Sequence, residues 1–290
     1  MAWQCFQLTY ELLSPLHIGC HKVGNLQRTR YYIPARNLWG AVTEALTRRG
    51  SSTNGAPQGS YAKIGEWVQD HCAFSYFYIL ENEQLLAPAY INGDLHYGNY
   101  PVAEFERRYL DSLVSTALSP QSTSAESGSL HEVEFISPHP LDVNSAGKRT
   151  RLRGQVFLDE EAQKYVEEIK KAMESMRLGG ERRYGFGRLR ISDNGWEEVR
   201  EMGDCPARLD SKRPQIQVAG GRPLLAHTLA QGVRARGMIE PLVGRETGKD
   251  SRSFGQALTQ ARVCWMPGSV AEQEGWLTLD KVGIWCAYNS

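Results

Sequence analysis

Glycine spacing in the segment LGGERRYGFGRLRI, residues 178–191, constrains the fold of this chain more than any other feature. Four glycines lie within it: Gly179, Gly180, Gly185 and Gly187. The first pair ends a stretch with helical periodicity, and the residues after the last glycine alternate as a strand does. Glycine allows backbone conformations and close approaches that a Cβ atom forbids. The sequence therefore predicts a helix, a tight loop and a strand, in that order.

Two amphipathic helices are predicted. The first starts near Pro34 and ends at Gly50, and its apolar stripe recurs at helical spacing: Leu38, Val42 and Leu46. The second is expected over residues 159–176, where acidic residues open the helix and complement its dipole. Its predicted buried face comprises Ala162, Tyr165, Val166, Ile169, Ala172, Met173 and Met176.

Strands are predicted by alternating or β-branched runs on either side of these helices. They are expected at 3–13, twice within 72–91 around a polar turn, at 131–137, at 151–158 and after Gly185. The stretch HIGCHKVGNLQRTR is expected to be a long loop, residues 51–60 a loop or disordered excursion, and 119–129 a low-complexity insertion.

The resulting order resembles β-α-β-β-α-β, so we expect an α+β protein with a ferredoxin-like (RRM-like) core and insertions. Such a sheet leaves one face free for RNA. We assign residues 1–195 to this domain. Residues 205–290 are expected to form a β-rich C-terminal extension or a second subdomain.

Composition excludes several classes of protein. The 290 residues carry 33 basic and 33 acidic side chains, with a hydrophobic share of 41%, so a globular fold is expected. No apolar run is long enough for a membrane span, and MAWQCFQLTY lacks a secretion signal, so a cytoplasmic location is expected. The pairs Cys20-His21 and His71-Cys72 suit a zinc site poorly, because adjacent ligands depart from the usual spacing. No cofactor is expected.

Basic charge is concentrated in two segments despite the balanced total. One is KRTRLR, which contains Lys148, Arg149, Arg151 and Arg153. The other is the glycine loop, which carries Arg182, Arg183, Tyr184 and Arg188. Glycines let backbone N–H groups surround a phosphate, arginines add charged contacts, and an aromatic ring stacks on a base. A P-loop is disfavoured, because it runs strand, loop, helix and needs a lysine. The alternative is a glycine-rich turn with solvated arginines.

Three motifs together resemble the RAMP superfamily of CRISPR proteins. They are LLSPLHIG at 12–19, YIPARNLWGAVTEAL at 32–46 and GGERRYGFG at 179–187. The resemblance implies a guide-RNA (crRNA) binding subunit of a type III effector complex, with Arg28, Arg30 and Arg36 as further contacts. It also implies three further partners: target RNA, which is contacted through the complex, neighbouring RAMP subunits, and a polymerase-like large subunit. Residues 237–269 resemble the tail of subunits of the III-D kind.

One departure from that pattern bears on catalysis. Target-cleaving RAMP subunits carry an aspartate between the first and second motifs, whereas residues 20–32 here contain no Asp or Glu. The resemblance therefore implies a non-cleaving subunit that holds the 5′ end of the guide. Two alternatives stay open: a metal-independent endoribonuclease for precursor RNA that uses His21 or His17, and a protein-interaction scaffold with little RNA contact.

Overall fold

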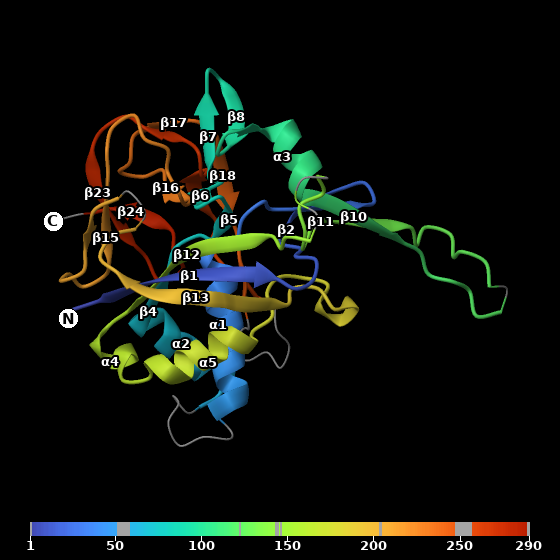
Figure 1. The fold of residues 1–290 in the computed structure, drawn as a ribbon, viewed down its shortest axis with the longest axis horizontal. Helices are drawn as coiled ribbons and strands as arrows, with labels where there is room; N and C mark the ends of the chain where they lie inside the picture. The colour runs from blue at the N-terminus through green and yellow to red at the C-terminus, as the bar shows by residue number, and fades with distance from the viewer. Residues whose placement is uncertain are drawn as a thin grey trace.

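A central antiparallel sheet carries helices on one face (Figure 1). The computed structural model describes residues 2–50, 59–121, 123–142, 145, 147–202, 205–246 and 257–288. The strand order is β13-β1-β12-β5-β6, with β4 also paired to β12. The bounds are β1 Gln4–Leu12, β4 Cys72–Phe74, β5 Tyr78–Glu81, β6 Gln84–Leu85, β12 Arg151–Leu158 and β13 Leu189–Val199. These strands confirm the predicted ones, including the polar turn between β5 and β6.

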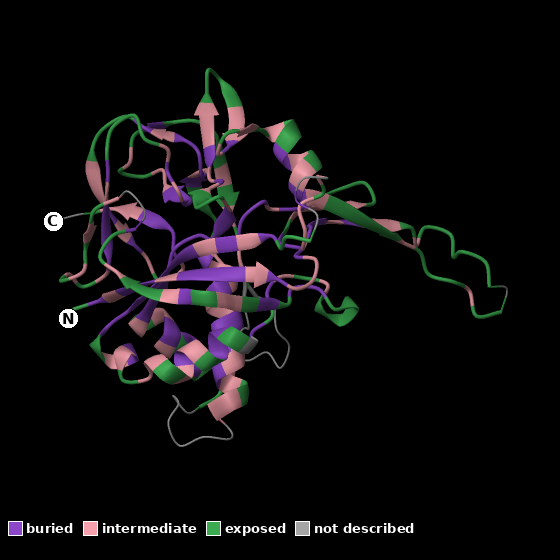
Figure 2. Ribbon diagram, in the orientation of Figure 1, coloured by how far each residue is buried: buried purple, intermediate pink, exposed green. Residues whose placement is uncertain are grey.

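The side chains of β1 alternate between the two faces of the central sheet. Leu8, Tyr10 and Leu12 are fully buried, and the Tyr10 hydroxyl donates to the Met173 carbonyl oxygen on the helical layer, at 3.3 Å. Because neighbouring strand residues point to opposite faces, Thr9 and Glu11 lie on the face away from these helices. Figure 2 shows the buried layer between the sheet and the helices.

The helical layer consists of α1 Ala35–Gly50, α2 Tyr61–His71, α4 Glu160–Gln163 and α5 Val166–Ser175. The first helix is confirmed. The prediction of one continuous helix over 159–176 was wrong, because the helix is interrupted at Lys164 and Tyr165. Tyr165 leaves helical geometry (φ −118°, ψ 21°), and its ring packs edge-on against Trp67, with centroids 5.7 Å apart.

The helix α2 was not predicted from the sequence. It begins after Ser60, whose side chain accepts a hydrogen bond from the Lys63 N–H, and it buries Ile64 and Val68 against the core. Residues 51–58 of the predicted excursion lie outside the described residues.

The segment expected to be a long loop is a β-hairpin, so that prediction was wrong. Strands β2 Gly19–Val23 and β3 Leu26–Thr29 meet at Gly24, whose φ of +59° suits a tight turn. They join β10 Leu110–Ser115 and β11 His131–Ile136 in a second sheet with the order β10-β11-β3-β2. The connection from β10 to β11 projects away from the body as an exposed arm (Figures 1 and 2).

A smaller insertion follows β6. It contains β7 Pro88–Ile91, β8 Asp94–Tyr97, β9 Tyr100–Pro101 and α3 Val102–Tyr109. Tyr97 and Phe105 stack with ring centroids 4.5 Å apart, and Tyr31 packs on both rings. The insertion is therefore anchored to the body through aromatic packing next to β3.

The C-terminal region is built of strands. Its main sheet has the order β14-β15-β23-β24-β16-β21-β18, and two further pairs are β17-β22 and β19-β20. The bounds are β14 Ala207–Arg208, β15 Gln215–Val218, β16 Thr228–Leu229, β17 Ala235–Arg236, β18 Ile239–Leu242, β19 Arg245–Glu246, β20 Ala257–Leu258, β21 Arg262–Trp265, β22 Val270–Ala271, β23 Gly275–Leu279 and β24 Trp285–Ala287.

This region shares a hydrophobic core with the preceding one. Leu224 and Trp285 belong to the same buried cluster as Leu8. The Trp3 N–H donates to the Leu209 carbonyl oxygen at 2.7 Å. The division between residues 195 and 205 stays a prediction. No described helix is long and apolar enough to cross a membrane.

Candidate nucleic-acid interface

The glycine loop connects α5 to β13, which confirms the predicted order of helix, loop and strand. Within it, residues Arg182–Tyr184 form a short 3-10 helix. Two left-handed residues flank this turn, Glu181 with φ 52° and Gly185 with φ 88°. The turn therefore presents Arg182, Arg183 and Tyr184 at the protein surface.

Close backbone packing explains two of the glycines. A Cβ atom on Gly179 would lie 2.2 Å from the His17 carbonyl oxygen, and one on Gly187 would lie 1.8 Å from the Leu178 carbonyl oxygen. The Gly180 N–H donates to the His17 oxygen at 2.9 Å, and the Gly187 N–H donates to the Pro15 oxygen at 2.8 Å. The structure thus brings the glycine loop against the segment SPLHIG, which is distant in sequence.

His17 is part of that contact and is only 4% exposed. Its Nδ1 atom lies 2.7 Å from the Glu134 carbonyl oxygen, and its ring lies beside the α-carbons of Gly19 and Gly180. His21 differs, because it is exposed on β2 and is paired across the hairpin with Arg28. The two histidines therefore occupy different environments.

Exposed groups gather on the turn of the loop. Tyr184 is 71% exposed, which is the highest value among the large hydrophobic side chains described. Arg183 and Arg188 are exposed, and no ion pair joins either side chain to another described residue. Arg182 is paired with Glu44 of α1. The loop thus offers the ring of Tyr184 and the unneutralised guanidinium groups of Arg183 and Arg188 to solvent.

The three arginines near the first helix are engaged within the protein. Arg28 lies 3.1 Å from a Glu134 carboxylate oxygen. Arg30 is 14% exposed and is bound to Glu240 of β18. Burial alone lowers the pKa of Arg30, but the hydrogen bonds and charge of Glu240 outweigh it and raise the pKa. Arg36 lies over the ring of Trp39, 5.6 Å from its centroid.

The basic segment 148–153 runs into β12 on the helix-free face. Arg151 and Arg153 both bind Glu83, at 3.2 and 2.7 Å, and these hydrogen bonds and charges lower the pKa of the Glu83 carboxyl. The Arg149 guanidinium donates to the Leu12 carbonyl oxygen, and Lys148 is exposed. A polar cavity of about 210 Å³ lies here, lined by Gln7, Thr9, Glu83, Arg151, Arg153, Ser192, Asp193, Asn194, Gly195 and Glu197.

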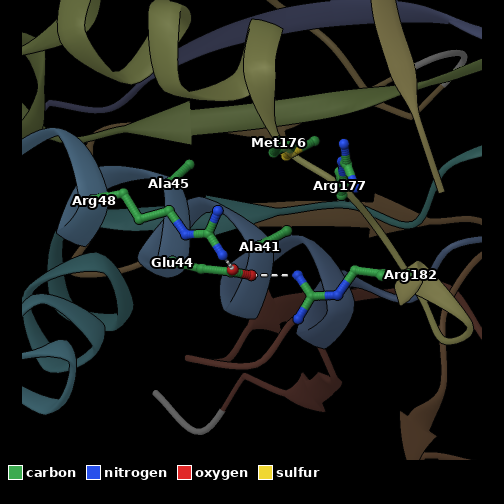
Figure 3. A pocket seen from close by; sticks show the side chains of 7 residues that line it. All are labelled: Ala41, Glu44, Ala45, Arg48, Met176, Arg177 and Arg182. Carbon is green, nitrogen blue, oxygen red and sulfur yellow. Dashed lines mark hydrogen bonds and ion pairs between the residues drawn. The ribbon is translucent and has the colours of Figure 1, made fainter. Parts of the chain in front are cut away.

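A second cavity of about 390 Å³ lies between α1 and residues 176–182 (Figure 3). Its charged lining residues are Glu44, Arg48, Arg177 and Arg182. Glu44 and Arg177 were not singled out in the sequence. One sequence feature could have identified Glu44: its spacing of four residues from Arg48 places both side chains on one face of α1.

Within the described residues, no three potential metal ligands among His, Cys, Asp and Glu lie together. The His71 Nδ1 atom lies 2.8 Å from an Asp159 carboxylate oxygen, and the Cys20 thiol donates to the Arg28 carbonyl oxygen. These side chains have structural partners within the chain.

Comparisons with known proteins identify the family of the chain and solved chains with a similar fold. No curated protein matches the sequence. Two chains in cryo-EM structures of the Type III-B Cmr-beta share the fold at 10% identity. One, bound to cognate target RNA and AMPPnP, aligns with a TM-score of 0.55, and the other, bound to cognate target RNA, with 0.53. Each alignment covers 92% of this chain and 86% of the other. The model of the RAMP superfamily matches residues 9–190, which is more than half of the sequence, and the chain therefore belongs to the RAMP superfamily.

Proposed function

We propose that this chain binds guide RNA as a structural, non-cleaving subunit of a cytoplasmic type III CRISPR effector complex. One observation carries the proposal: the glycine loop is fixed against the His17 segment while Arg183 and Tyr184 remain exposed on its turn. The packing holds the turn in place, so its exposed side chains are presented from a fixed backbone. Membership of the RAMP superfamily and the fold shared with Cmr-beta chains support the assignment.

The core is proposed to be ferredoxin-like. In chain order, the elements are β1, α1, the β4–β5 segment, β12, α5 and β13, and their spatial order is β13-β1-β12-β5. Each of these neighbouring strand pairs is antiparallel. This pattern supports a split β-α-β arrangement in which one sheet face is left without these helices.

Each exposed group of the loop has a chemical role in the proposal. Arg183 and Arg188 supply charged hydrogen bonds to backbone phosphates, which position RNA without reading its sequence. Tyr184 stacks on a base. Because Arg28, Arg30, Arg151 and Arg153 have carboxylate partners in the free chain, their part in RNA binding requires exchange of those partners.

Absence of target cleavage is proposed from the hairpin of β2 and β3. Residues 20–32 contain no carboxylate. The nearby Glu134 is bound to Arg28 and to the Thr29 N–H. The hairpin therefore offers no carboxylate to an RNA 2′-hydroxyl placed beside it, and the nearby Glu134 is already engaged. The exposed His21 supports the alternative of metal-independent processing, which specific cleavage of repeat RNA in EDTA would establish.

The test is co-expression of the tagged chain with its neighbouring genes, followed by sequencing of the RNA that co-purifies. We expect small RNAs with a shared repeat-derived 5′ end, together with other RAMP subunits and a polymerase-like large subunit. Arg183→Ala combined with Tyr184→Ala should remove the RNA. Arg200→Ala is the matched control, because Arg200 is an exposed arginine that directly follows β13, at the end of the strand away from the glycine loop. Recovery of the chain with neither RNA nor RAMP subunits would refute the proposal.

A further inference from the structure

The cavity between α1 and residues 176–182 is lined by an unusual set of charges. Three guanidinium groups border it, those of Arg48, Arg177 and Arg182, and one carboxylate, that of Glu44. Three positive charges and one negative charge leave a local excess of two (Figure 3). Such an excess in a concave site attracts an anion.

Glu44 lies between two of these arginines. Its carboxylate is 2.6 Å from the Arg48 guanidinium, and its other oxygen binds Arg182. Figure 3 shows both interactions, with the carboxylate bridging the two side chains. For Arg177, no hydrogen bond or ion pair of the side chain is found with the described residues. The two oxygens of Glu44 therefore bind only two of the three guanidinium groups that line the cavity.

The walls of the cavity leave room for a larger anion. Ala41 and Ala45 present only methyl groups from α1, and the buried Met176 closes one side. A volume of about 390 Å³ falls in the range of small-ligand sites. Arg182 belongs both to this cavity and to the turn that carries Tyr184, so the cavity is continuous with the proposed RNA surface.

We propose that this cavity is a phosphate-binding site, and that Glu44 acts as its internal anion in the free chain. This inference rests on the proposed function, because an RNA strand bound at the turn would place a backbone phosphate next to Arg182, which also lines the cavity. On binding, a phosphate oxygen replaces Glu44 as the partner of Arg182. A second phosphate oxygen binds Arg177, whose side chain has no ion pair with the described residues. Glu44 keeps its contact with Arg48, which is four residues further along the helix.

The proposed ligand is a phosphate group, and experiments can distinguish which molecule supplies it. An internal phosphodiester, a terminal 5′-phosphate and free inorganic phosphate all offer oxygens to guanidinium groups. Exposed ion pairs such as that of Glu44 and Arg182 are weak, so exchange for a phosphate has a low cost. The proposal therefore makes an unusual claim: removing the Glu44 charge strengthens phosphate binding.

The experiment measures binding of short labelled single-stranded RNA to the full chain by fluorescence anisotropy over a range of salt concentrations. Glu44→Gln should raise affinity about fivefold at low salt. It should also steepen the dependence of log affinity on log salt by about 0.7 per added phosphate contact. The matched control is Glu161→Gln, which removes one carboxylate from an exposed ion pair with Lys164 on α4. Arg177→Ala should abolish the gain in the Glu44→Gln background.

Three probes distinguish the sources: RNA with a 5′-phosphate, the same RNA with a 5′-hydroxyl, and inorganic phosphate followed by thermal unfolding. A gain with both RNAs identifies an internal phosphodiester, and a gain with the first alone identifies a terminal phosphate. If the wild-type chain binds no RNA but Glu44→Gln is stabilised by inorganic phosphate, the proposed function fails and the site stands. Equal behaviour of Glu44→Gln and Glu161→Gln with every probe, or weaker RNA binding by Glu44→Gln, would overturn the site.

Discussion

The guanidinium of Arg30 donates to the carboxylate of Glu240, a residue 210 positions later in the chain, with one Nη1–Oε2 distance of 3.1 Å. The same carboxylate lies 3.0 Å from Nε2 of His227, and Nδ1 of that ring lies 2.8 Å from the Tyr76 hydroxyl. A neutral imidazole with its proton on Nε2 satisfies both contacts: it donates to Glu240 and accepts from Tyr76. This network joins the hairpin of the RAMP-matched segment to the C-terminal sheet.

Replacement of Arg30 by Ala is expected to lower the free energy of unfolding by about 1–3 kcal/mol, because the partly buried Glu240 carboxylate loses its guanidinium partner. Denaturant titration of both proteins measures this change. RNA affinity should fall less than it does in Arg183→Ala, which in turn should unfold like the wild type. A variant Arg30→Ala that keeps full stability but loses RNA would show instead that Arg30 contacts RNA directly.

Acid should weaken the same network in two steps. Burial is the largest influence on the pKa of His227, which it lowers. Burial is also the largest influence on Glu240, whose pKa it raises. The hydrogen bonds from His227 and Arg30 and their charges outweigh this effect and bring the pKa of Glu240 down to about 2. A depressed folded-state pKa stabilises the fold above the unfolded pKa, and this contribution is lost as the pH falls towards the folded value. The His227 contribution therefore declines below about pH 6.5 and that of Glu240 below about pH 4.5.

The measurement for this prediction is the melting temperature as a function of pH, for the wild type and for His227→Gln. Glutamine retains an N–H donor for Glu240 but does not titrate. The wild type should therefore lose more stability than the variant between about pH 6.5 and pH 5. Parallel profiles over that window would exclude His227 as the titrating group.

The glycine loop offers a comparison between two positions with positive φ. Alanine at Gly185 (φ +88°) meets no atom within 4 Å, so only the left-handed backbone is unfavourable, at about 1–2 kcal/mol. Alanine at Gly179 (φ +81°) carries the same cost and also collides with the His17 carbonyl oxygen. We expect Gly179→Ala to destabilise the protein clearly more than Gly185→Ala in urea unfolding. Equal losses would mean that the loop does not hold the His17 segment.

Local patterns were sufficient for the sheet and for α1. Alternation placed β1 and β12 correctly, and the pair Gly179-Gly180 marked the end of the helical layer. These features depend on residues close in sequence, which is why they were predictable. The Tyr165 break and the hairpin around Gly24 were missed, because the first depends on packing against Trp67 and the second on pairing with β11, both distant in the chain.

The same distinction between local and distant residues applies to the candidate site. That the glycine loop is basic and carries an aromatic side chain is a property of consecutive residues, and the sequence alone indicated it. The partners of Arg30, Arg153 and Arg182 are Glu240, Glu83 and Glu44, and each pair joins residues at least 70 positions apart. The sequence predicts that these arginines contact RNA, whereas the fold pairs each of them with a carboxylate that only tertiary structure brings near.

Tyr184 provides the most direct separation of RNA binding from folding. Because the side chain is 71% exposed on a short 3-10 turn, its removal should leave unfolding unchanged. If its ring stacks on a base, Tyr184→Ala should weaken RNA binding by about 1–3 kcal/mol, while Tyr184→Phe, which keeps the ring, should bind nearly as well as the wild type. Anisotropy with single-stranded RNA at fixed salt measures all three proteins. Wild-type affinity in Tyr184→Ala would exclude base stacking by Tyr184 and leave Arg183 and Arg188 as phosphate contacts alone.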